Sequence, residues 1–189
     1  AAASWTGGIA NQNRGTLGGN IVNASPAADS SPALLVYDAE LELASVRGTR
    51  RIPYKEFHTG YKQLQMKDDE LLRSIHLPRR PEEWRQYSRK VGPRKAQAIS
   101  KICLAAAMRM NMDVIEDIRI AAGSVAPVPL RCYIAESVLR GQRLSPGTIS
   151  CAREAIATEV QPINDIRSTD RYRRMVAANL LGEFLENVK

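Results

Sequence analysis

The segment KICLAAAMRMNMDVIEDIRIAAG, residues 101–123, constrains the fold more than any other part of the chain. Apolar residues recur at every second position in both of its halves, which is typical of a strand with one buried face. Its alanines favour a helix instead, and a helical face fits part of the segment too. The even-numbered apolar positions are Ile102, Leu104, Ala106, Met108, Met110, Met112, Ile118, Ile120 and Ala122, and the helical face would be Ile99, Ile102, Cys103, Ala106 and Met110.

Periodicity alone does not distinguish a strand from a helix in this segment. The presence of a second strand to pair with it is the criterion that we use. A strand is stable only when another strand pairs with it. The alternation resumes after residues 111–113, and the second alternating stretch supplies that partner nearby. We therefore predict an antiparallel hairpin that turns between Asn111 and Asp113.

The last third of the chain contains helix signals. Pro127 and Pro129 remove backbone donors and exclude a regular helix before Leu130. From Leu130 we predict a short helix ending at Gly141, since glycine is favoured just past a helix end. The order is thus strands followed by helices.

Two further helices are predicted from their capping residues. Ser145 followed by Pro146 is typical of a helix start, and Pro162 closes that helix. Either Ser168 or Thr169 caps the final helix. The buried stripe predicted for the final helix is Tyr172, Met175, Val176, Leu180 and Phe184.

The first part of the chain also predicts strands, and a break separates it from the rest. Residues 41–46 alternate apolar and polar before a turn at 47–49, which indicates a hairpin. Pro78 and Pro81 interrupt the chain near its middle, so we predict two domains, 1–78 and 79–189. The fold class is α+β, with a small antiparallel sheet of three strands packed with three helices in the second domain.

Composition limits the classes of partner. Lys and Arg number 27 against 20 Asp and Glu, a net charge of +7. This charge suits a nucleic acid, an anionic cofactor or an acidic partner. Nucleic acid ranks last, because aromatic residues are only 5% and no reader motif is present. No apolar run is long enough to span a membrane, so we expect a cytoplasmic protein without membrane contact.

Metal and disulfide chemistry are not indicated. The three cysteines are widely spaced without a CxxC pair, and neither histidine has a carboxylate at ligand spacing. We predict that Cys103, Cys132 and Cys151 are buried thiols and that no residue binds a metal.

Two adjacent glycines, Gly18 and Gly19, mark the stretch RGTLGGN as a candidate binding element. Glycine permits positive φ and brings backbone amides close to a ligand, and Thr16 and Asn20 add short polar groups. The dinucleotide pattern GxGxxG and the phosphate-loop pattern GxxxxGK[ST] are both absent. On these residues alone, a turn and a cofactor loop are equally good interpretations.

The longer stretch RGTLGGNIVNASPAADSSPALL closely resembles the flavin-binding loop of the FAD subunit in the xanthine dehydrogenase and carbon monoxide dehydrogenase family of molybdenum hydroxylases. Further stretches resemble the family in order: RGTRR, FHTGY, DELLRSIHLP, YSRKVGPRKAQAIS, GSVAPVPLR and NDIRSTDRYRR. The resemblance covers essentially the whole chain, but only the carboxy-terminal two-thirds of the family's subunit. An amino-terminal FAD subdomain is expected to be missing, either through truncation, or because the chain is a natural fragment, or because another chain supplies that half. The residues that match the loop are Arg14, Thr16, Leu17, Gly18, Gly19, Asn20, Ser25, Pro26 and Asp29.

The resemblance implies FAD as cofactor and assigns roles to particular residues. It implies that residues 1–78 are the second subdomain, a remnant of the flavin-binding domain, and that 79–189 are the carboxy-terminal domain of the flavoprotein subunit. Asp29 would hydrogen-bond the cofactor, Leu72 would contact it and Lys90 would offset its charge, while residues 91–101 would gate access to the flavin. No residue is expected to be catalytic. The implied FAD-binding residues are Thr16, Leu17, Gly18, Gly19, Asn20, Asp29, Leu72 and Lys90.

Without the resemblance, three of these residues have simpler interpretations. Asp29 fits the start of a helix over SSPALLV equally well, and Lys90 fits an exposed cation better. Leu72 fits a core position.

The implied function is electron transfer within an oxidoreductase complex. Electrons from a molybdopterin-binding large subunit would cross an iron-sulfur small subunit, reduce FAD here and pass to NAD or another acceptor. The isolated 189 residues are expected to be inactive. The alternative is an accessory or scaffold chain that docks the other subunits without retaining FAD alone.

Overall fold

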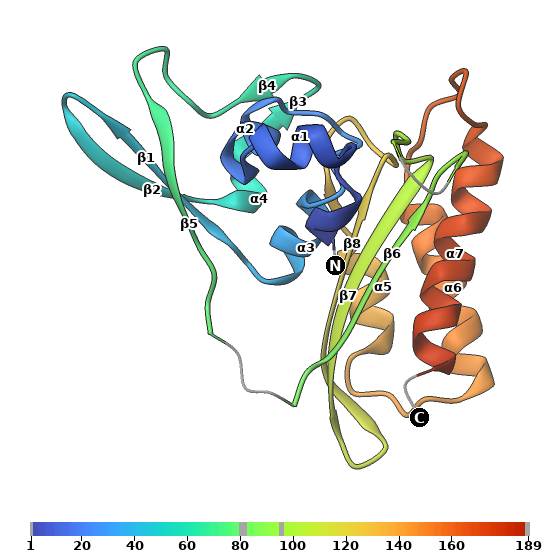
Figure 1. Ribbon diagram of the computed structural model, residues 1–189. Coiled ribbons are helices and arrows are strands. Elements are labelled where there is room, and N and C mark those ends of the chain that lie inside the picture. The colour runs from blue at the N-terminus through green and yellow to red at the C-terminus, as the bar shows by residue number, and fades with distance from the viewer. Residues whose placement is uncertain (1, 80–82, 95–96, 188–189) are drawn as a thin grey trace.

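The computed structural model describes residues 2–79, 83–94 and 97–187 of the chain; Pro81 lies outside the described residues. At its centre is an antiparallel sheet with the strand order β6-β7-β8-β9 (Figure 1). Its strands are β6 (Arg85–Val91), β7 (Ile102–Asn111), β8 (Val114–Gly123) and β9 (Leu130–Arg131). The predicted three-stranded sheet is confirmed in its three long strands, and the two-residue β9 extends one edge.

The predicted hairpin is confirmed as β7 and β8. Asn111 pairs with Val114, which leaves Met112 and Asp113 as the turn. Met112 adopts a left-handed φ of 51° there. The strand interpretation of this segment is therefore correct despite its alanines.

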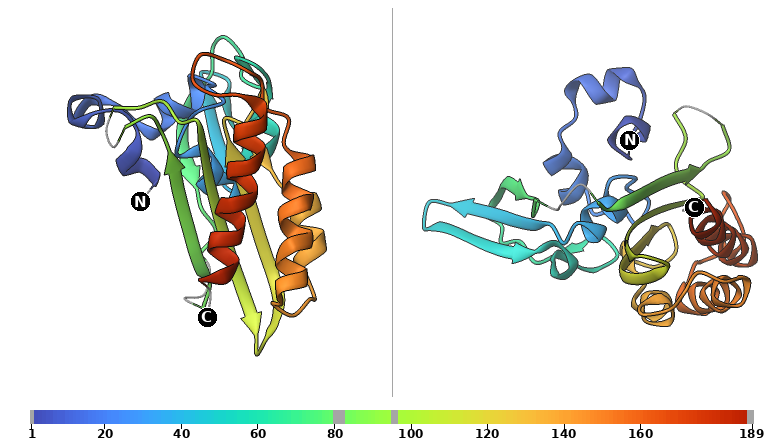
Figure 2. Two further views of the ribbon diagram at one scale, coloured as in Figure 1. Left: turned by 90° about the vertical axis from the view of Figure 1, so that its right-hand side faces the viewer. Right: turned by 90° about the horizontal axis from the view of Figure 1, so that it is seen from below.

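Three helices cover one face of the central sheet, as predicted (Figures 1 and 2). They are α5 (Tyr133–Leu139), α6 (Pro146–Glu159) and α7 (Asp170–Glu186). The first begins at Tyr133 and not at Leu130, because Leu130 and Arg131 pair with β8. Gly141 follows its end with a φ of 79°, as a helix-terminating glycine should.

Side-chain caps start the other two helices. The Ser145 hydroxyl accepts a hydrogen bond from the Thr148 N–H at 3.1 Å. Of the two candidate caps of α7, Thr169 is the one used, and its hydroxyl accepts from the Tyr172 N–H at 3.2 Å.

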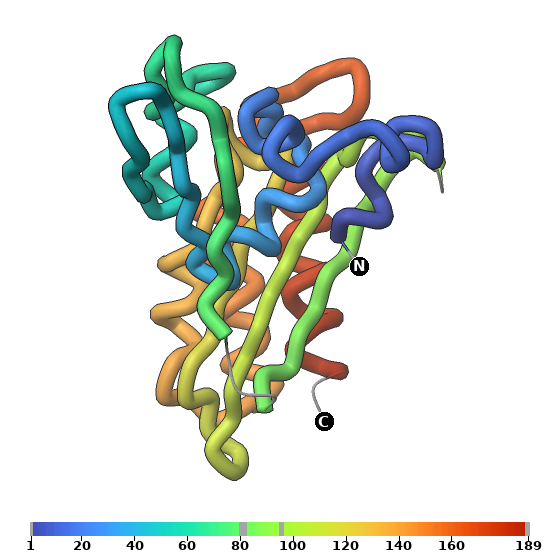
Figure 3. The backbone as a smooth tube through the Cα atoms, turned by 60° about the vertical axis from the view of Figure 1, so that its left-hand side comes forward, coloured from blue at the N-terminus to red at the C-terminus, as the bar shows by residue number. Residues whose placement is uncertain are grey.

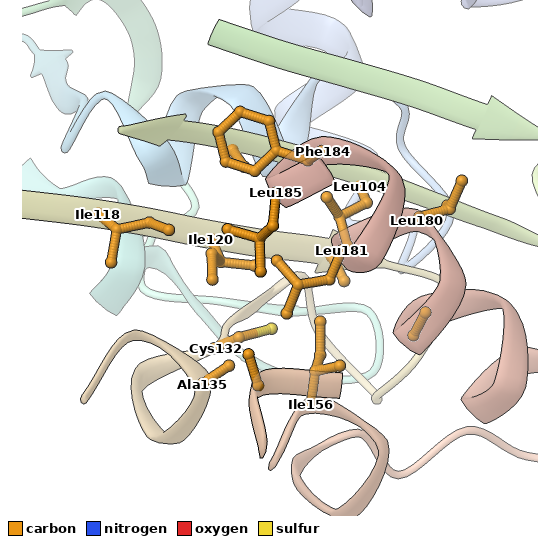
Figure 4. Packing of buried hydrophobic residues seen from close by; sticks show 14 of the residues in the cluster. Leu104, Ile118, Ile120, Cys132, Ala135, Ile156, Leu180, Leu181, Phe184 and Leu185 are labelled. Atoms are coloured by element: carbon orange, nitrogen blue, oxygen red, sulfur yellow. The ribbon is translucent and has the colours of Figure 1, made fainter. Parts of the chain in front are cut away.

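The main core lies between the sheet and these helices, where even-numbered strand residues meet α7 (Figure 4). Leu180 and Phe184 are buried as predicted, but Met175 is 54% exposed and Tyr172 and Val176 are only half-buried. The buried stripe is rotated from the predicted one and includes Arg173, whose guanidinium donates to the Ser124 carbonyl and pairs with Asp165. The apolar residues that α7 buries are Ala177, Leu180, Leu181, Phe184 and Leu185.

Helix α3 (Ser31–Val36) packs on the opposite face of the same sheet. The strand residues beneath it are Ala105, Ala107 and Ala121, all buried. Their small side chains let the helix lie close to the strands. One sheet therefore supports two cores, one on each face.

The predicted amino-terminal hairpin is confirmed as β1 (Glu40–Ser45) and β2 (Gly48–Pro53). Its turn lies at residues 46–47 and not at the predicted 47–49, because Gly48 and Thr49 already pair with Ser45 and Ala44. With β5 (Leu71–His76) it forms a second sheet that extends away from the helices α5–α7 (Figure 2). Short elements complete the chain: η1 (Ala2–Trp5), α1 (Ile9–Arg14), α2 (Leu17–Val22), α4 (Tyr54–Phe57), β3 (His58–Gly60) and β4 (Gln63–Leu64).

Two of the three cysteines are buried. Cys103 lies on β7 and Cys132 next to α5, both within cores. The prediction is wrong for Cys151, which is exposed because it lies on the outer side of α6.

Candidate functional site

A cavity of about 840 Å³ lies where the first thirty residues meet loops of the second half of the chain. In Figure 3 the amino-terminal segment passes close to the loop before α7. The volume is within the range of small-molecule sites in proteins. The lining residues fall within 6–11, 20–29, 97–100, 124–127 and 163–173, together with Tyr61.

Asp29 and Lys90, both predicted site residues, contact each other; Asp29 lines this cavity, and Lys90 lies behind it and does not. The Lys90 ammonium donates to a carboxylate oxygen of Asp29 at 2.6 Å and to the carbonyl of Trp5 at 2.9 Å. Ser100 donates from its hydroxyl to the other carboxylate oxygen. The Asp29 side chain is 7% exposed and that of Lys90 11%, so this is a buried ion pair.

Asn20 is the one residue of the 16–20 stretch that lines the cavity. Its side-chain oxygen accepts a hydrogen bond from the Ser30 hydroxyl at 2.6 Å. Thr16 caps α2, and its hydroxyl accepts from the Gly19 N–H at 2.9 Å.

The two glycines do not adopt the left-handed conformation that the sequence suggested. Both lie in the first turn of α2, and neither has a positive φ. A Cβ built on Gly18 would make ordinary van der Waals contact with Leu72, 3.6 Å from its Cδ2, so the packing there does not require a glycine. Leu72 is half-buried on β5 beside α2, and Leu17 is 41% exposed. The structure thus brings Leu72 to the glycine turn and not to the cavity lining.

Ser100, Ser124 and Arg173, which the sequence did not single out, connect the segments of the cavity wall by hydrogen bonds. Ser124 donates from its hydroxyl to the carbonyl of Ser100 at 3.1 Å and from its N–H to the carbonyl of Pro26 at 2.8 Å. Arg173 donates to the carbonyl of Ser124 at 2.9 Å. They lie within stretches that carried the family resemblance, but no periodicity or charge pattern marks them.

Two titratable groups at or behind the cavity wall, Asp165 and Cys103, have shifted pKa values. Although burial opposes it, hydrogen bonds from the Arg167 N–H and the Arg173 guanidinium lower the pKa of Asp165 to about 2. Burial raises the pKa of the Cys103 thiol, behind Asp29, to about 12. Asp165 is thus a carboxylate and Cys103 a neutral thiol at neutral pH.

Two polar atoms of lining residues have no partner within the part of the chain that the structure describes. They are Thr6 Oγ1 and Arg173 Nε, and both are inaccessible to solvent. Buried polar groups in folded proteins are rarely left without a hydrogen bond. Because neither atom is exposed to the cavity, neither is a contact point for a ligand there in this conformation.

Neither a metal site nor a membrane-spanning helix is found among the described residues. Within 2–79, 83–94 and 97–187, no three His, Cys, Asp or Glu side chains gather as a metal site would require. No helix in these ranges has the length and apolar character needed to cross a membrane.

Comparison with known proteins identifies the family. Residues 87–188 match the carbon monoxide dehydrogenase flavoprotein C-terminal domain, and residues 1–80 match the FAD binding domain in molybdopterin dehydrogenase. The chain belongs to the FAD-binding subunits of the xanthine and carbon monoxide dehydrogenase family.

Members of this family resemble the chain over nearly all of its length. It is 36% identical over 174 residues to the xanthine dehydrogenase FAD-binding subunit of Escherichia coli O157:H7, covering 92% of this chain and 60% of that subunit. It is 31% identical to the nicotine 6-hydroxylase medium subunit of Paenarthrobacter nicotinovorans, covering 90% and 59%. The chain therefore spans about three-fifths of the length of these relatives.

A solved structure of the family has the same fold. Carbon monoxide dehydrogenase from Hydrogenophaga pseudoflava superimposes with a TM-score of 0.92 at 26% identity, over 98% of this chain and 64% of that one. The α+β fold expected from the sequence is thereby confirmed.

Proposed function

We propose that this chain forms part of the FAD site of an oxidoreductase complex and holds the flavin in the cavity between its two halves. The observation that carries the proposal is that Asn20 and Asp29, two residues assigned to FAD by resemblance, line one cavity, with Lys90 paired to Asp29.

The residues present suit a large, polar and anionic cofactor. Arg167 and Arg173 bring cations to the cavity lining, and Asn20 and Asp29 bring hydrogen-bonding groups, while Lys90 acts through its ion pair with Asp29. Tyr61, Ile99 and Ile163 contribute apolar surface that excludes water from a ring. When bound, FAD supplies reversible two-electron redox chemistry, and the chain's own task is to bind, orient and shield it. Thr16, Leu17, Gly18, Gly19 and Leu72 would support the same site from α2 and β5.

The proposed partners are a molybdopterin-binding large subunit and an iron-sulfur small subunit, with NAD or another molecule as electron acceptor. Support comes from the relatives, which are named as medium subunits or medium chains. We also propose that the chain divides near Pro78, that residues 91–101 gate the flavin and that the complex is cytoplasmic.

An accessory role without independent FAD retention is the second proposal. It is supported by the position of Thr16, Leu17, Gly18, Gly19 and Leu72, which were assigned to FAD by resemblance and do not line the cavity. Under this proposal the chain folds and docks the other subunits, but it does not retain FAD alone. Further protein is then needed to complete the flavin site.

Titration of the purified chain with FAD, followed by flavin absorbance and fluorescence, separates the two proposals. Saturable uptake that Lys90→Met weakens about tenfold or more supports the first. Lys55→Met, an exposed position on α4, is the control for losing a lysine. A folded chain that takes up no FAD supports the second proposal, and equal affinity of Lys90→Met and wild type removes the assigned role of Lys90.

A further inference from the structure

Ser124 occupies a backbone position that a serine rarely takes. It follows β8 directly and has a left-handed φ of 65°. Such a conformation is strained for a residue with a side chain and is usually taken by glycine. A glycine is present one residue earlier, at Gly123, where a Cβ would lie 2.7 Å from Cys103 Sγ. The chain therefore uses its glycine for close packing and keeps a side chain at the strained position.

The hydroxyl of Ser124 begins a continuous series of buried hydrogen bonds that ends at the cavity ion pair. It donates to the carbonyl of Ser100, and the Ser100 hydroxyl donates to Asp29. Lys90 then contacts the remaining carboxylate oxygen of Asp29. Ser100 is 1% exposed and Ser124 6%, so water does not compete for these bonds.

Ser124 is itself fixed from two sides. Its N–H donates to the carbonyl of Pro26 in the first half of the chain, and its carbonyl accepts from Arg173 of α7. Arg173 is 4% exposed and also pairs with Asp165 at 2.6 Å. All three hydrogen-bonding groups of Ser124 are thus engaged, each with a different segment.

We propose that Ser124 is a positioning residue for the flavin site: through Ser100 it fixes the orientation of the Asp29 carboxylate and, with it, the Lys90 ammonium. Asp29 needs a separate donor for each oxygen to hold one rotamer. Removing the Ser124 hydroxyl frees the carbonyl of Ser100, and the segment that carries the Ser100 donor then loses its anchor. The consequence for FAD rests on the proposed function, whereas the consequence for Asp29 does not.

The test compares Ser124→Ala with Ser124→Gly. Both remove the hydroxyl, but only glycine relieves the left-handed strain, so the two variants differ in stability while sharing the lost bond. We expect both to bind FAD about five- to tenfold more weakly and to alter the circular dichroism of bound flavin. Ser137→Ala is the matched control, since the Ser137 hydroxyl also donates to a carbonyl, at 2.7 Å, but on α5.

Hydrogen exchange of the protein without FAD gives an independent readout. We expect faster amide exchange at residues 97–101 and 27–31 in both Ser124 variants and in Ser100→Ala, and unchanged exchange in β1 and β2. If these variants exchange faster and the wild-type chain binds no FAD, the positioning of Asp29 by Ser124 is supported. FAD binding by this chain is then contradicted. The inference is overturned if Ser124→Gly exchanges as slowly as the wild type at residues 97–101 and 27–31. It is also overturned if the wild type binds FAD and the Ser124 variants bind it equally tightly.

Discussion

Asp29 and Lys90 lie 61 positions apart in the sequence and 2.6 Å apart in space. Resemblance assigned each to the cofactor separately, and the fold adds that each is the other's partner. Neither charge can be removed without leaving the other buried and unpaired, which is costly. Loss of either residue should therefore affect folding as well as ligand binding.

A double-mutant cycle tests this coupling. Asp29→Asn and Lys90→Met should each lower the free energy of unfolding by about 3 kcal/mol, and the double variant by clearly less than the sum. Urea denaturation measures all three. The exposed pair of Arg143 and Asp113, 3.3 Å apart, is the control, and breaking it should cost less than about 1 kcal/mol. Additive losses at Asp29 and Lys90 would contradict the coupling.

His58 makes stability depend on pH. Burial lowers the pKa of its imidazole below the usual 6.5, although the bond to the Ile21 carbonyl at 3.0 Å opposes this. A lowered pKa means that the folded state prefers neutral histidine. The stabilisation is complete above pH 6.5 and is lost as pH falls through the folded-state value.

We therefore expect the free energy of unfolding to decrease as pH is lowered below about 6.5, and His58→Gln to flatten this part of the profile. Denaturant titrations at a series of pH values measure it. His76→Gln is the control for losing a histidine, and an unchanged slope in His58→Gln would refute the assignment.

At the scale of single elements, the sequence left open whether Ser168 or Thr169 caps α7. Thr169 supplies the capping oxygen, whereas Ser168 contributes backbone bonds to Asp165. Thr169→Ala should lower the free energy of unfolding by about 1 kcal/mol, and Ser168→Ala by much less. Thermal or urea unfolding of the two variants decides, and equal losses would show that the cap is shared.

The sequence predicted those elements whose signals are local. The hairpin of β7 and β8 follows from alternation and a polar turn, and the caps at Ser145 and Thr169 follow from side-chain chemistry next to the helix. The stripe of α7 was misplaced because a buried arginine on that face has no apolar signature. The pair Gly18 and Gly19 suggested positive φ, but neither glycine has one, and the space beside Gly18 would admit a Cβ.

The cavity could not be predicted by such local signals. Its walls come from segments as far apart in the sequence as Thr6 and Arg173, and only the folded chain brings them together. Family resemblance supplied Asn20, Asp29 and Lys90 as candidates. Ser100 and Ser124 were missed because a serine becomes informative only through its partners.

At the scale of the whole molecule, the two halves share one sheet. The alanines of β7 and β8 form the surface on which α3 rests, so the apolar cluster of the first half is completed by the second. Arg131 adds a polar tie, donating to the Leu35 carbonyl at 2.9 Å while pairing with buried Glu136.

It follows that residues 1–79 expressed alone should not fold cooperatively, because α3 and its buried leucines lack their support. Circular dichroism and one-dimensional NMR of that fragment test this. Residues 83–187 carry the larger core and should retain more structure in the same measurements. A well-dispersed spectrum of 1–79 alone would contradict the shared-sheet description.

The position of α3 on β7 and β8 also sets an order of events during synthesis. The ribosome synthesises α3 well before residues 102–123. The helix therefore has no sheet to pack against until β7 and β8 have left the ribosome. The hairpin of β7 and β8 is a local structure that can close soon after its last residue is free. We expect the half of the protein that is translated first to complete its folding only after that hairpin has formed, with its apolar surface exposed in the interval to chaperones.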